Sequence, residues 1–346
     1  MPPSLSLTTP DAAVAELTVH DRPQPSALDP TEMTTGSERA GRAAVRTRRS
    51  SVTQQLRDYL TLTKPHIISL LLVTTVTPMI AAAAGWPGGG LVLWTLLGGY
   101  LMAGGANAVN MFIDRDIDAV MGRTALRPLP SGRMAPAHVL LFGLSLAAAA
   151  FLLFLTQVNR VAALLALAGF LYYVLIYTLW LKRRSPQNIV IGGGAGAFPP
   201  LVGWAAVTGS VSLTALGLFL VVVLWTPPHF WALALVKQKE YGRAGVPMAP
   251  NVWGERRTLR QMVTYTWLLV GTSIGLVAFG DLGPVYAALA AVLGAWFLHH
   301  ILTLYRATSI TQPAWKAYRV SLLYLFLLFA AVAVDALVWG GRAIGG

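Results

Sequence analysis

Long apolar blocks follow one another along the chain beyond residue 65, each close to the length of a membrane-spanning helix. A helix of about 20 apolar residues crosses the hydrocarbon core of a bilayer. The blocks predict nine spans, at residues 66–86, 91–111, 138–157, 161–181, 188–207, 213–233, 262–280, 284–304 and 320–338. Backbone groups in lipid must be hydrogen-bonded internally, and the blocks lack the apolar–polar alternation of membrane barrel strands. We therefore predict an all-α polytopic membrane protein with nine transmembrane helices.

Charge alternates between successive connections and predicts the orientation of the spans. The connections after spans two, four and six are rich in Lys and Arg, whereas WPGGG, TGSVS and FGDLGP contain neither. Only Arg160 breaks the alternation. By the positive-inside rule, the N-terminus lies in the cytoplasm and the C-terminus outside, on opposite sides as nine spans require.

Composition agrees with a membrane protein and narrows the choice of partner. The chain is 55% hydrophobic and 12% charged, whereas soluble domains carry about 25% charged residues. Lys and Arg outnumber Asp and Glu by 26 to 14, but no basic run is interleaved with aromatics in a soluble segment. We therefore expect the lipid bilayer, and no nucleic acid, as partner. The absence of cysteine excludes disulfides, thiolate metal sites and cysteine nucleophiles.

The first 55 residues differ from the rest in being rich in Pro, Ser and Thr and poor in large apolar side chains. Such a segment buries too little surface to offset the entropy of ordering. We expect residues 1–55 to be a disordered cytoplasmic tail, basic near its end, before a membrane domain at 56–346. Acidic residues in the tail argue against a mitochondrial presequence. The expected location is therefore the inner membrane of a bacterial cell rather than the mitochondrial inner membrane.

The first long internal loop opens with the acidic stretch NMFIDRDID. On a helix Asn110, Asp114 and Asp118 repeat every four residues and share one face, while Asp116 points away. Stacked carboxylates need a counter-charge, and hard oxygen ligands suit Mg²⁺, which often bridges to phosphates. The sequence therefore predicts a metal site on Asn110, Asp114 and Asp118.

Arginines follow the acids in the sequence. The acids alone predict a metal site, whereas acids and arginines together predict a different kind of site. Arg123 and Arg127 lie in MGRTALRPLPSGR, and arginine forks match phosphate oxygens. Carboxylates, a metal and arginines together indicate a diphosphate site. The alternative is a loop whose Asp and Arg residues only pair with each other.

The second long internal loop follows span six, in WTPPHFWALALVKQKEYGRAGVPMAP. Lys237 and Lys239 are candidates for holding phosphate, and Pro227 and Pro228 would break or bend the helix near His229. A histidine in an apolar span is a haem ligand, a proton carrier or an inert packed residue, and the sequence leaves these open.

These stretches resemble the UbiA-type intramembrane prenyltransferases. NMFIDRDIDAVMGRTALRPLPSG resembles the first Asp-rich motif of that family. LTKPHIISLLLVTT, NIVIGGGAGAFPPLVGWAAVTG and WTPPHFWALALVKQKEYGRAGVPMAP resemble its protoheme IX farnesyltransferase branch. The resemblance covers roughly residues 55 to 340. It implies a nine-helix bundle around a central cavity that opens toward the internal loops, with Mg²⁺ on the Asp-rich motif.

The resemblance also implies a reaction. The donor would be farnesyl diphosphate and the acceptor haem B, giving haem O on the pathway to haem A, with a haem A synthase as a candidate downstream partner. Asp114, Asp118, His229 and Lys237 would then be catalytic. Arg123, Arg127, Lys237, Lys239 and Lys64 would bind diphosphate; His229 would bind haem; and Asn110, Asp114, Asp118 and Glu240 would bind metal.

Two other functions remain open at this stage. One is prenyl transfer to an aromatic quinone precursor, although related enzymes of that kind carry a second Asp-rich motif after span six, where this chain has His229 and Glu240. The other is a cation-coupled transporter. Transport sites usually lie at mid-membrane on several spans, whereas these acids gather at one rim. Asp335, within span nine, has no role that the sequence predicts.

Overall fold

The computed structural model describes the backbone of residues 51–343 and the side chains of residues 51–338. Within these residues every regular element is a helix. The predicted tail lies outside the described residues except for its last positions, where Val52 begins helix α2 (Val52–Thr63). Nine helical segments of the described chain are long and apolar enough to cross a membrane, which confirms the predicted count.

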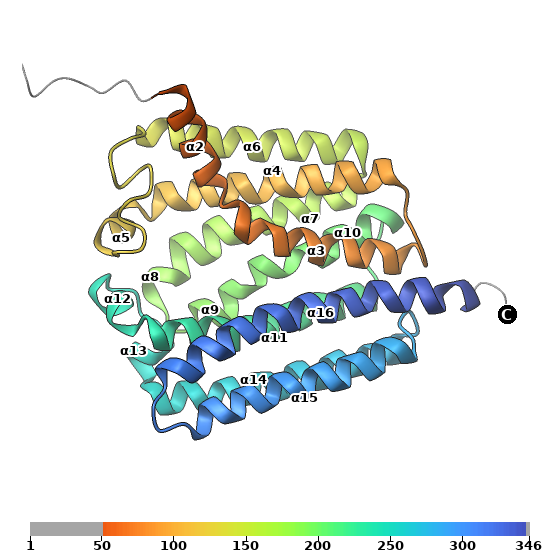
Figure 1. Cartoon of the computed structure of the whole chain (residues 1–346). Coiled ribbons are helices and arrows are strands. Elements are labelled where there is room, and N and C mark those ends of the chain that lie inside the picture. The colour runs from red at the N-terminus through yellow and green to blue at the C-terminus, as the bar shows by residue number, and fades with distance from the viewer. Residues whose placement is uncertain (1–50, 344–346) are drawn as a thin grey trace, which may run out of the picture. The chain divides into compact units, whose positions relative to one another are not determined.

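The nine spans lie side by side as one bundle (Figure 1). Six of them are single helices: α3 (Pro65–Ala82), α4 (Gly89–Ile113), α6 (Pro136–Gln157), α11 (Leu213–Val236), α15 (Pro284–Arg306) and α16 (Thr311–Ala343). The remaining three are composite: α7 (Arg160–Leu171), η1 (Tyr172–Leu181) and α8 (Lys182–Arg184); α9 (Asn188–Gly192), η2 (Gly193–Ala197) and α10 (Phe198–Thr208); and α14 (Glu255–Gly275) with η3 (Leu276–Phe279).

Spans seven and nine begin earlier than the apolar pattern predicts. They start at Glu255 and Thr311 rather than at 262 and 320. The added turns, ERRTLRQ and TQPAWKAYR, contain charged residues, so a search for apolar blocks passes over them. Hydropathy locates the part of a helix that lies in hydrocarbon, whereas the backbone hydrogen bonds continue into the polar rim.

Short helices gather at one end of the bundle. They are α5 (Arg115–Val120) in the first long loop, and α12 (Gln238–Arg243) and α13 (Ala249–Trp253) in the second. Figure 1 places them together with α8 at this end, which we call the loop end. Both loops predicted to be internal therefore meet, while the side of the membrane on which they lie stays a prediction.

Glycine allows the closest helix contacts. A Cβ on Gly105 of α4 would lie 2.6 Å from the carbonyl oxygen of Gly143 on α6, and a Cβ on Gly203 of α10 would lie 2.0 Å from the oxygen of Thr75 on α3. Small residues allow membrane helices to pack backbone against backbone, where van der Waals contact replaces the missing hydrophobic driving force.

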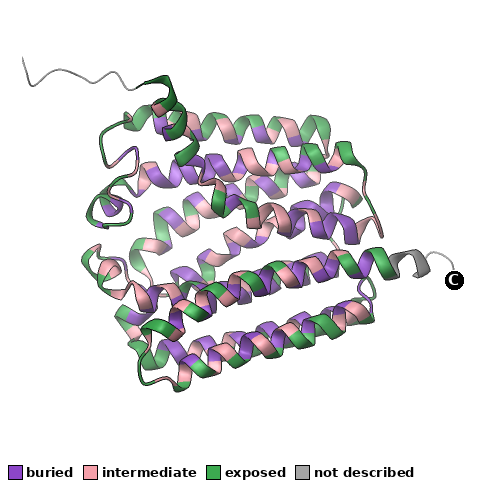
Figure 2. Ribbon diagram, in the orientation of Figure 1, coloured by how far each residue is buried: buried purple, intermediate pink, exposed green. Residues whose placement is uncertain are grey.

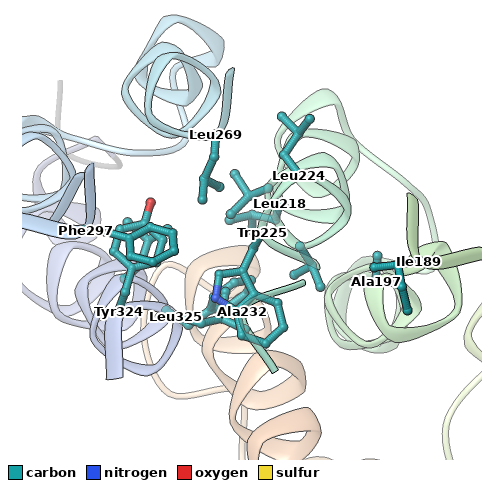
Figure 3. Close-up of a cluster of buried hydrophobic side chains, with 14 of the residues drawn as sticks. Ile189, Ala197, Leu218, Leu224, Trp225, Ala232, Leu269, Phe297, Tyr324 and Leu325 are labelled. Atoms are coloured by element: carbon teal, nitrogen blue, oxygen red, sulfur yellow. The ribbon is translucent and has the colours of Figure 1, made fainter. Parts of the chain in front are cut away.

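The outer face of the bundle is apolar and exposed. Leu141, Leu164 and Val292 are 65%, 59% and 67% exposed, respectively, and exposed positions alternate with buried ones along the outer helices (Figure 2). Inside, a cluster of buried side chains joins α11 to α14, α15 and α16, with Trp225, Phe297 and Tyr324 among its largest members (Figure 3). An apolar exterior around a packed interior is the pattern of a helical protein in lipid.

Candidate active site

The loop end of α4 carries the predicted carboxylate face. α4 ends at Ile113, Asp114 is its C-cap, and α5 begins one residue later. The backbone nitrogens of Asp114 and Asp118 donate to the carbonyls of Asn110 and Asp114 at 2.9 and 2.8 Å, so helical spacing continues through the junction. Asn110, Asp114 and Asp118 are buried, whereas the Asp116 side chain is 62% exposed. The four-residue spacing thus separates the buried face from Asp116, as predicted.

Asn110 is at the centre of a hydrogen-bond network that joins three spans. Its side-chain nitrogen donates to Asp114 Oδ2 at 2.7 Å and to Thr178 Oγ1 of η1 at 3.2 Å. Its oxygen accepts from the Lys64 ammonium at 3.1 Å. All polar atoms of this buried amide therefore have partners, which fixes the amide's orientation.

Asp114 is buried, and only one of its two carboxylate oxygens accepts hydrogen bonds. Its Oδ2 accepts from Asn110 and from the ammonium of Lys182 on α8. Its Oδ1 is buried and has no hydrogen-bond partner among the described residues, and the Arg183 guanidinium lies 3.7 Å away. A buried carboxylate oxygen without a donor is costly.

The other two acids pair with arginines. Arg127 donates to the buried Asp118 at 2.6 Å. Arg183 holds Asp116 with two bonds of 2.7 Å and holds the pKa of that exposed carboxyl at about 2. The alternative of acids and arginines pairing within the loop thus applies to Asp118 and Arg127.

Lys64 enters the site from a strained backbone position. It joins α2 to α3 with φ of 56° and ψ of 60°, a left-handed conformation that few residues other than glycine adopt. Burial, and to a smaller extent the charges of Arg127 and Lys182, lower the pKa of Lys64 to about 7. Asp118 and Asp114 act in the opposite direction. The side chain is therefore surrounded by the carboxylates and cations of the cluster.

An unusual helix lines the cluster on the side of span four. Residues Tyr172–Leu181 form a π-helix, and the Thr178 hydroxyl donates to the Tyr173 carbonyl, five residues back, at 2.8 Å. Tyr173 and Tyr177 stack at 5.5 Å, and both interact electrostatically with Asp114. Tyr172 instead donates to the Ile191 carbonyl at 2.9 Å, toward span five. π-Helical turns are frequently found at functional sites, and this one contains Tyr173 and Tyr177, next to the Thr178 that Asn110 contacts.

The second loop approaches the same cluster through α12. Lys237 pairs with Glu240 at 2.7 Å, and Oε2 of Glu240 is buried without a hydrogen-bond partner in the described chain. The pKa of Tyr241 is raised, mainly by burial. Tyr241 also interacts electrostatically with Tyr177, and with Arg123, Lys182 and Glu240. Tyr241 therefore lies near charged groups of both loops.

An open cleft of about 420 Å³ lies between the two loops and the end of span four. Asp116 and Arg183 lie on one side, and Arg243 lies on the other. Arg123 and Lys239 are exposed and make no ion pair with any described carboxylate. The structure thus brings Lys64 and Arg127 into the buried cluster and leaves Arg123 and Lys239 at its rim.

His229 lies on α11 in an aromatic setting rather than among the acids. α11 runs without a break through Pro227 and Pro228, so of the predicted break or bend the break does not occur. The imidazole stacks on Trp225 of the same helix (labelled in Figure 3) at 4.3 Å and on Tyr318 of α16 at 4.8 Å. His229 is 5% exposed.

One hydrogen bond fixes which nitrogen of His229 is free. Nδ1 lies 2.7 Å from the Ser321 hydroxyl, and that hydroxyl donates its single proton to the Tyr318 carbonyl at 2.7 Å. We infer that the Ser321 oxygen accepts from Nδ1–H, which leaves a lone pair on Nε2. This is the tautomer that binds a metal through Nε2.

Sequence reasoning missed two members of the cluster, Lys182 and Thr178. Lys182 belongs to the basic run KRR after span four, a pattern that indicates orientation but no particular site. Among the described residues no three His, Asp or Glu side chains gather closely enough to form a metal site by themselves. Any ion at this cluster would therefore also need the Asn110 oxygen, a substrate or water.

Residues 70–329 match the UbiA prenyltransferase family. The chain is 56% identical over 284 residues to a protoheme IX farnesyltransferase of Roseiflexus sp. (strain RS-1), covering 82% of this chain and 53% of that protein. It thus spans about half the length of that relative. The protoheme IX farnesyltransferase of Symbiobacterium thermophilum is 52% identical, with 82% of this chain and 95% of that protein covered.

Solved structures share the fold at low sequence identity. Digeranylgeranylglyceryl phosphate synthase superimposes with a TM-score of 0.69 at 20% identity, covering 82% of this chain and 99% of that one. A UbiA homologue from Archaeoglobus fulgidus, bound to GPP and Mg²⁺, superimposes with a TM-score of 0.58 at 15% identity, covering 80% and 99%. The UbiA prenyltransferase family matches most of this chain, and both protoheme IX farnesyltransferases are more than half identical to it over the aligned residues. The chain therefore belongs to the UbiA prenyltransferase family.

Proposed function

We propose that the chain transfers the farnesyl group of farnesyl diphosphate to a vinyl group of haem B, with addition of water, to give haem O. The allylic C–O bond breaks and diphosphate leaves with the electron pair. The vinyl group then bonds to the allylic carbon. Water adds to the neighbouring vinyl carbon and releases a proton, so atoms and charge balance. The names of the Roseiflexus and Symbiobacterium relatives support this donor and acceptor.

One observation carries the donor half of the proposal: Asp114 is a buried carboxylate with one free oxygen, at the end of a span and among cations. Glu240 has the second buried carboxylate oxygen that lacks a hydrogen bond in the described chain. The sequence predicts both as metal-binding residues. We propose that Asn110, Asp114 and Asp118 hold Mg²⁺, with Glu240 as a further ligand. The bound ion would neutralise the diphosphate and make it a better leaving group.

The cations around the acids would bind the diphosphate itself. Arg127 and Lys182 now neutralise Asp118 and Asp114. With a metal bound to the acids, these side chains would be available to the phosphate oxygens, together with Lys64 and Lys237. Fixed positive charges stabilise the negative charge that develops on a departing diphosphate. Arg123 and Lys239, at the rim, would attract the substrate from the internal side.

Tyr173 and Tyr177 would act on the farnesyl side of the allylic C–O bond that breaks. Their stacked rings lie within the electrostatic reach of Asp114. Aromatic faces attract cations, and an apolar surround keeps water from the allylic cation. These two side chains would thus shield the cation until the acceptor reaches it.

His229 supports the acceptor half of the proposal. Stacking on Trp225 and Tyr318 fixes the plane of the imidazole ring. The hydrogen bond between Nδ1 and the Ser321 hydroxyl of α16 leaves the Nε2 lone pair on the other side of the ring. We propose that His229 binds or orients the haem. The expected setting is the cell membrane of a bacterium, and a haem A synthase that consumes the product stays a prediction.

The test is an assay of membranes containing the full chain, supplied with farnesyl diphosphate, Mg²⁺ and either haem B or a hydroxybenzoate quinone precursor. Haem O should form, and the aromatic acid should remain unprenylated. Prenylation of the hydroxybenzoate instead would favour the quinone-precursor alternative. The absence of both products, while the Symbiobacterium relative makes haem O under the same conditions, would contradict the proposal.

A further inference from the structure

A cleft of about 620 Å³ lies between α15 and α16, away from the candidate active site. His299, His300 and Thr303 line it from the last turns of α15; Gln312, Lys316 and Arg319 line it from the first turns of α16. α15 contacts α14, η3 and α16, and it lies at the edge of the bundle (Figure 1). The cleft therefore faces the surroundings of the protein rather than its interior.

The cleft is positive and lacks an acidic partner. Lys316 and Arg319 are exposed, and no ion pair of the described chain includes either. No Asp or Glu occurs between Pro284 and Val334. Two neighbouring cations without a counter-charge repel each other, so an anion between them is stabilising.

The position of the cleft along the helices places it at a membrane interface. It lies at the last turns of α15 and the first turns of α16, where Arg256, just after the second loop, donates to the Tyr305 carbonyl at 3.1 Å. The cleft is thus at the loop end of the bundle. Basic side chains at the ends of spans lie at headgroup depth.

Apolar side chains continue from the cleft toward the middle of the membrane. Leu323 and Phe326 follow Lys316 and Arg319 by seven residues each, so each lies two turns, about 10 Å, deeper on the same face. They are 48% and 44% exposed. Val292 precedes His299 by seven residues on α15 and is 67% exposed. A charged head above an exposed apolar stripe matches an amphiphile rather than a free anion.

We propose that this cleft binds one anionic phospholipid, with its headgroup phosphate at Lys316 and Arg319 and its acyl chains along Leu323, Phe326 and Val292. The opposite side of α16 presents Tyr318 and Ser321 to His229. The lipid therefore binds the outer side of the helix whose inner side positions that histidine. The site does not depend on the proposed farnesyl transfer.

The test is native mass spectrometry of the full chain released from nanodiscs of equal parts phosphatidylglycerol and phosphatidylcholine. Wild type should retain phosphatidylglycerol in preference to phosphatidylcholine, and Lys316→Gln with Arg319→Gln should lower that retention by about tenfold. The matched control, Arg57→Gln with Arg260→Gln, removes two exposed arginines elsewhere and should retain the lipid like wild type. Millimolar inorganic phosphate should not displace it.

Equal retention of the two lipids by wild type, or equal retention of phosphatidylglycerol by the double variant and its control, would overturn the proposal. Displacement by inorganic phosphate would indicate an anion site without lipid specificity and would overturn it as well. If the double variant does not elute as a single species, the charge-preserving pair Lys316→Arg and Arg319→Lys decides. It should retain phosphatidylglycerol, and failure to do so in a folded protein would count against the site.

Discussion

Two buried aspartates, Asp114 and Asp335, are each 1% exposed and are bound in opposite ways. Asp335 of α16 accepts from the backbone nitrogens of Gly283 and Tyr286 at 2.6 and 2.9 Å, so both of its oxygens are satisfied at the N-terminus of α15. Asp114 is held by side chains from other elements and keeps one oxygen free. Burial of a carboxylate therefore does not by itself indicate a functional site.

The kind of partner explains the difference. Backbone N–H groups at a helix start are fixed and favour negative charge, so they hold a carboxylate permanently. Lysine and arginine side chains can turn to another anion when a ligand arrives. Asp335 is bound by backbone N–H groups, and we assign it a structural role. Asp114 is bound by side chains that can turn away, and we assign it a role in ligand binding.

The largest effect is expected for Asp114→Asn. The substitution keeps the shape and removes the charge, so farnesyl transfer should fall by about 10³-fold while the protein still folds. Product formation in membranes and elution in detergent measure the two quantities. Activity within a few-fold of wild type would remove Asp114 from the proposed machinery.

Asp335→Asn should show the reverse pattern. An amide offers one acceptor in place of two and leaves a buried backbone N–H without a partner, so unfolding should become easier by about 2 kcal/mol. Thermal unfolding in detergent measures this loss. The activity of the folded fraction should stay near that of wild type; a selective loss of turnover at unchanged stability would assign Asp335 to function instead.

His229→Phe separates the two halves of the proposed reaction. Phenylalanine preserves the stacking on Trp225 and Tyr318 but removes both ring nitrogens, so haem affinity should fall by about tenfold or more. The shift of the haem absorption band on titration measures it. Binding of farnesyl diphosphate should not change, and unchanged haem affinity would leave His229 with a packing role.

The smallest effect is expected for Asp116→Asn, two residues from Asp114. Its ion pair with Arg183 is exposed, and such pairs contribute less than about 1 kcal/mol. Activity should stay within about threefold of wild type, as measured in the same membrane assay. A loss as large as that of Asp114→Asn would show that the helical spacing does not separate the two acids.

Local patterns predicted much of this molecule from sequence. Apolar length located the nine spans, and four-residue spacing grouped Asn110, Asp114 and Asp118 because the junction of α4 and α5 keeps helical hydrogen bonds. Partners distant in sequence were missed. Lys182 lies 68 residues from Asp114 and Ser321 lies 92 from His229, and no local pattern connects them.

The roles of Asp335 and η1 were missed for a related reason. A lone acid within an apolar block gives no sign of which backbone it caps, since Gly283 is 52 residues away. The apolar block of span four likewise gives no sign that Tyr172–Leu181 forms a π-helix, in which Tyr172 turns to span five while Tyr173 and Tyr177 stack on each other.

Calorimetric titration of farnesyl diphosphate into the full chain, with and without Mg²⁺, tests the central claim most directly, since it needs no acceptor and no turnover. Wild type should bind much more tightly with Mg²⁺ than without it, and Asp114→Asn should lose that difference, while Asp335→Asn should keep it. Equal dependence on Mg²⁺ in wild type and Asp114→Asn would contradict the assignment of the carboxylate cluster as the metal and diphosphate site.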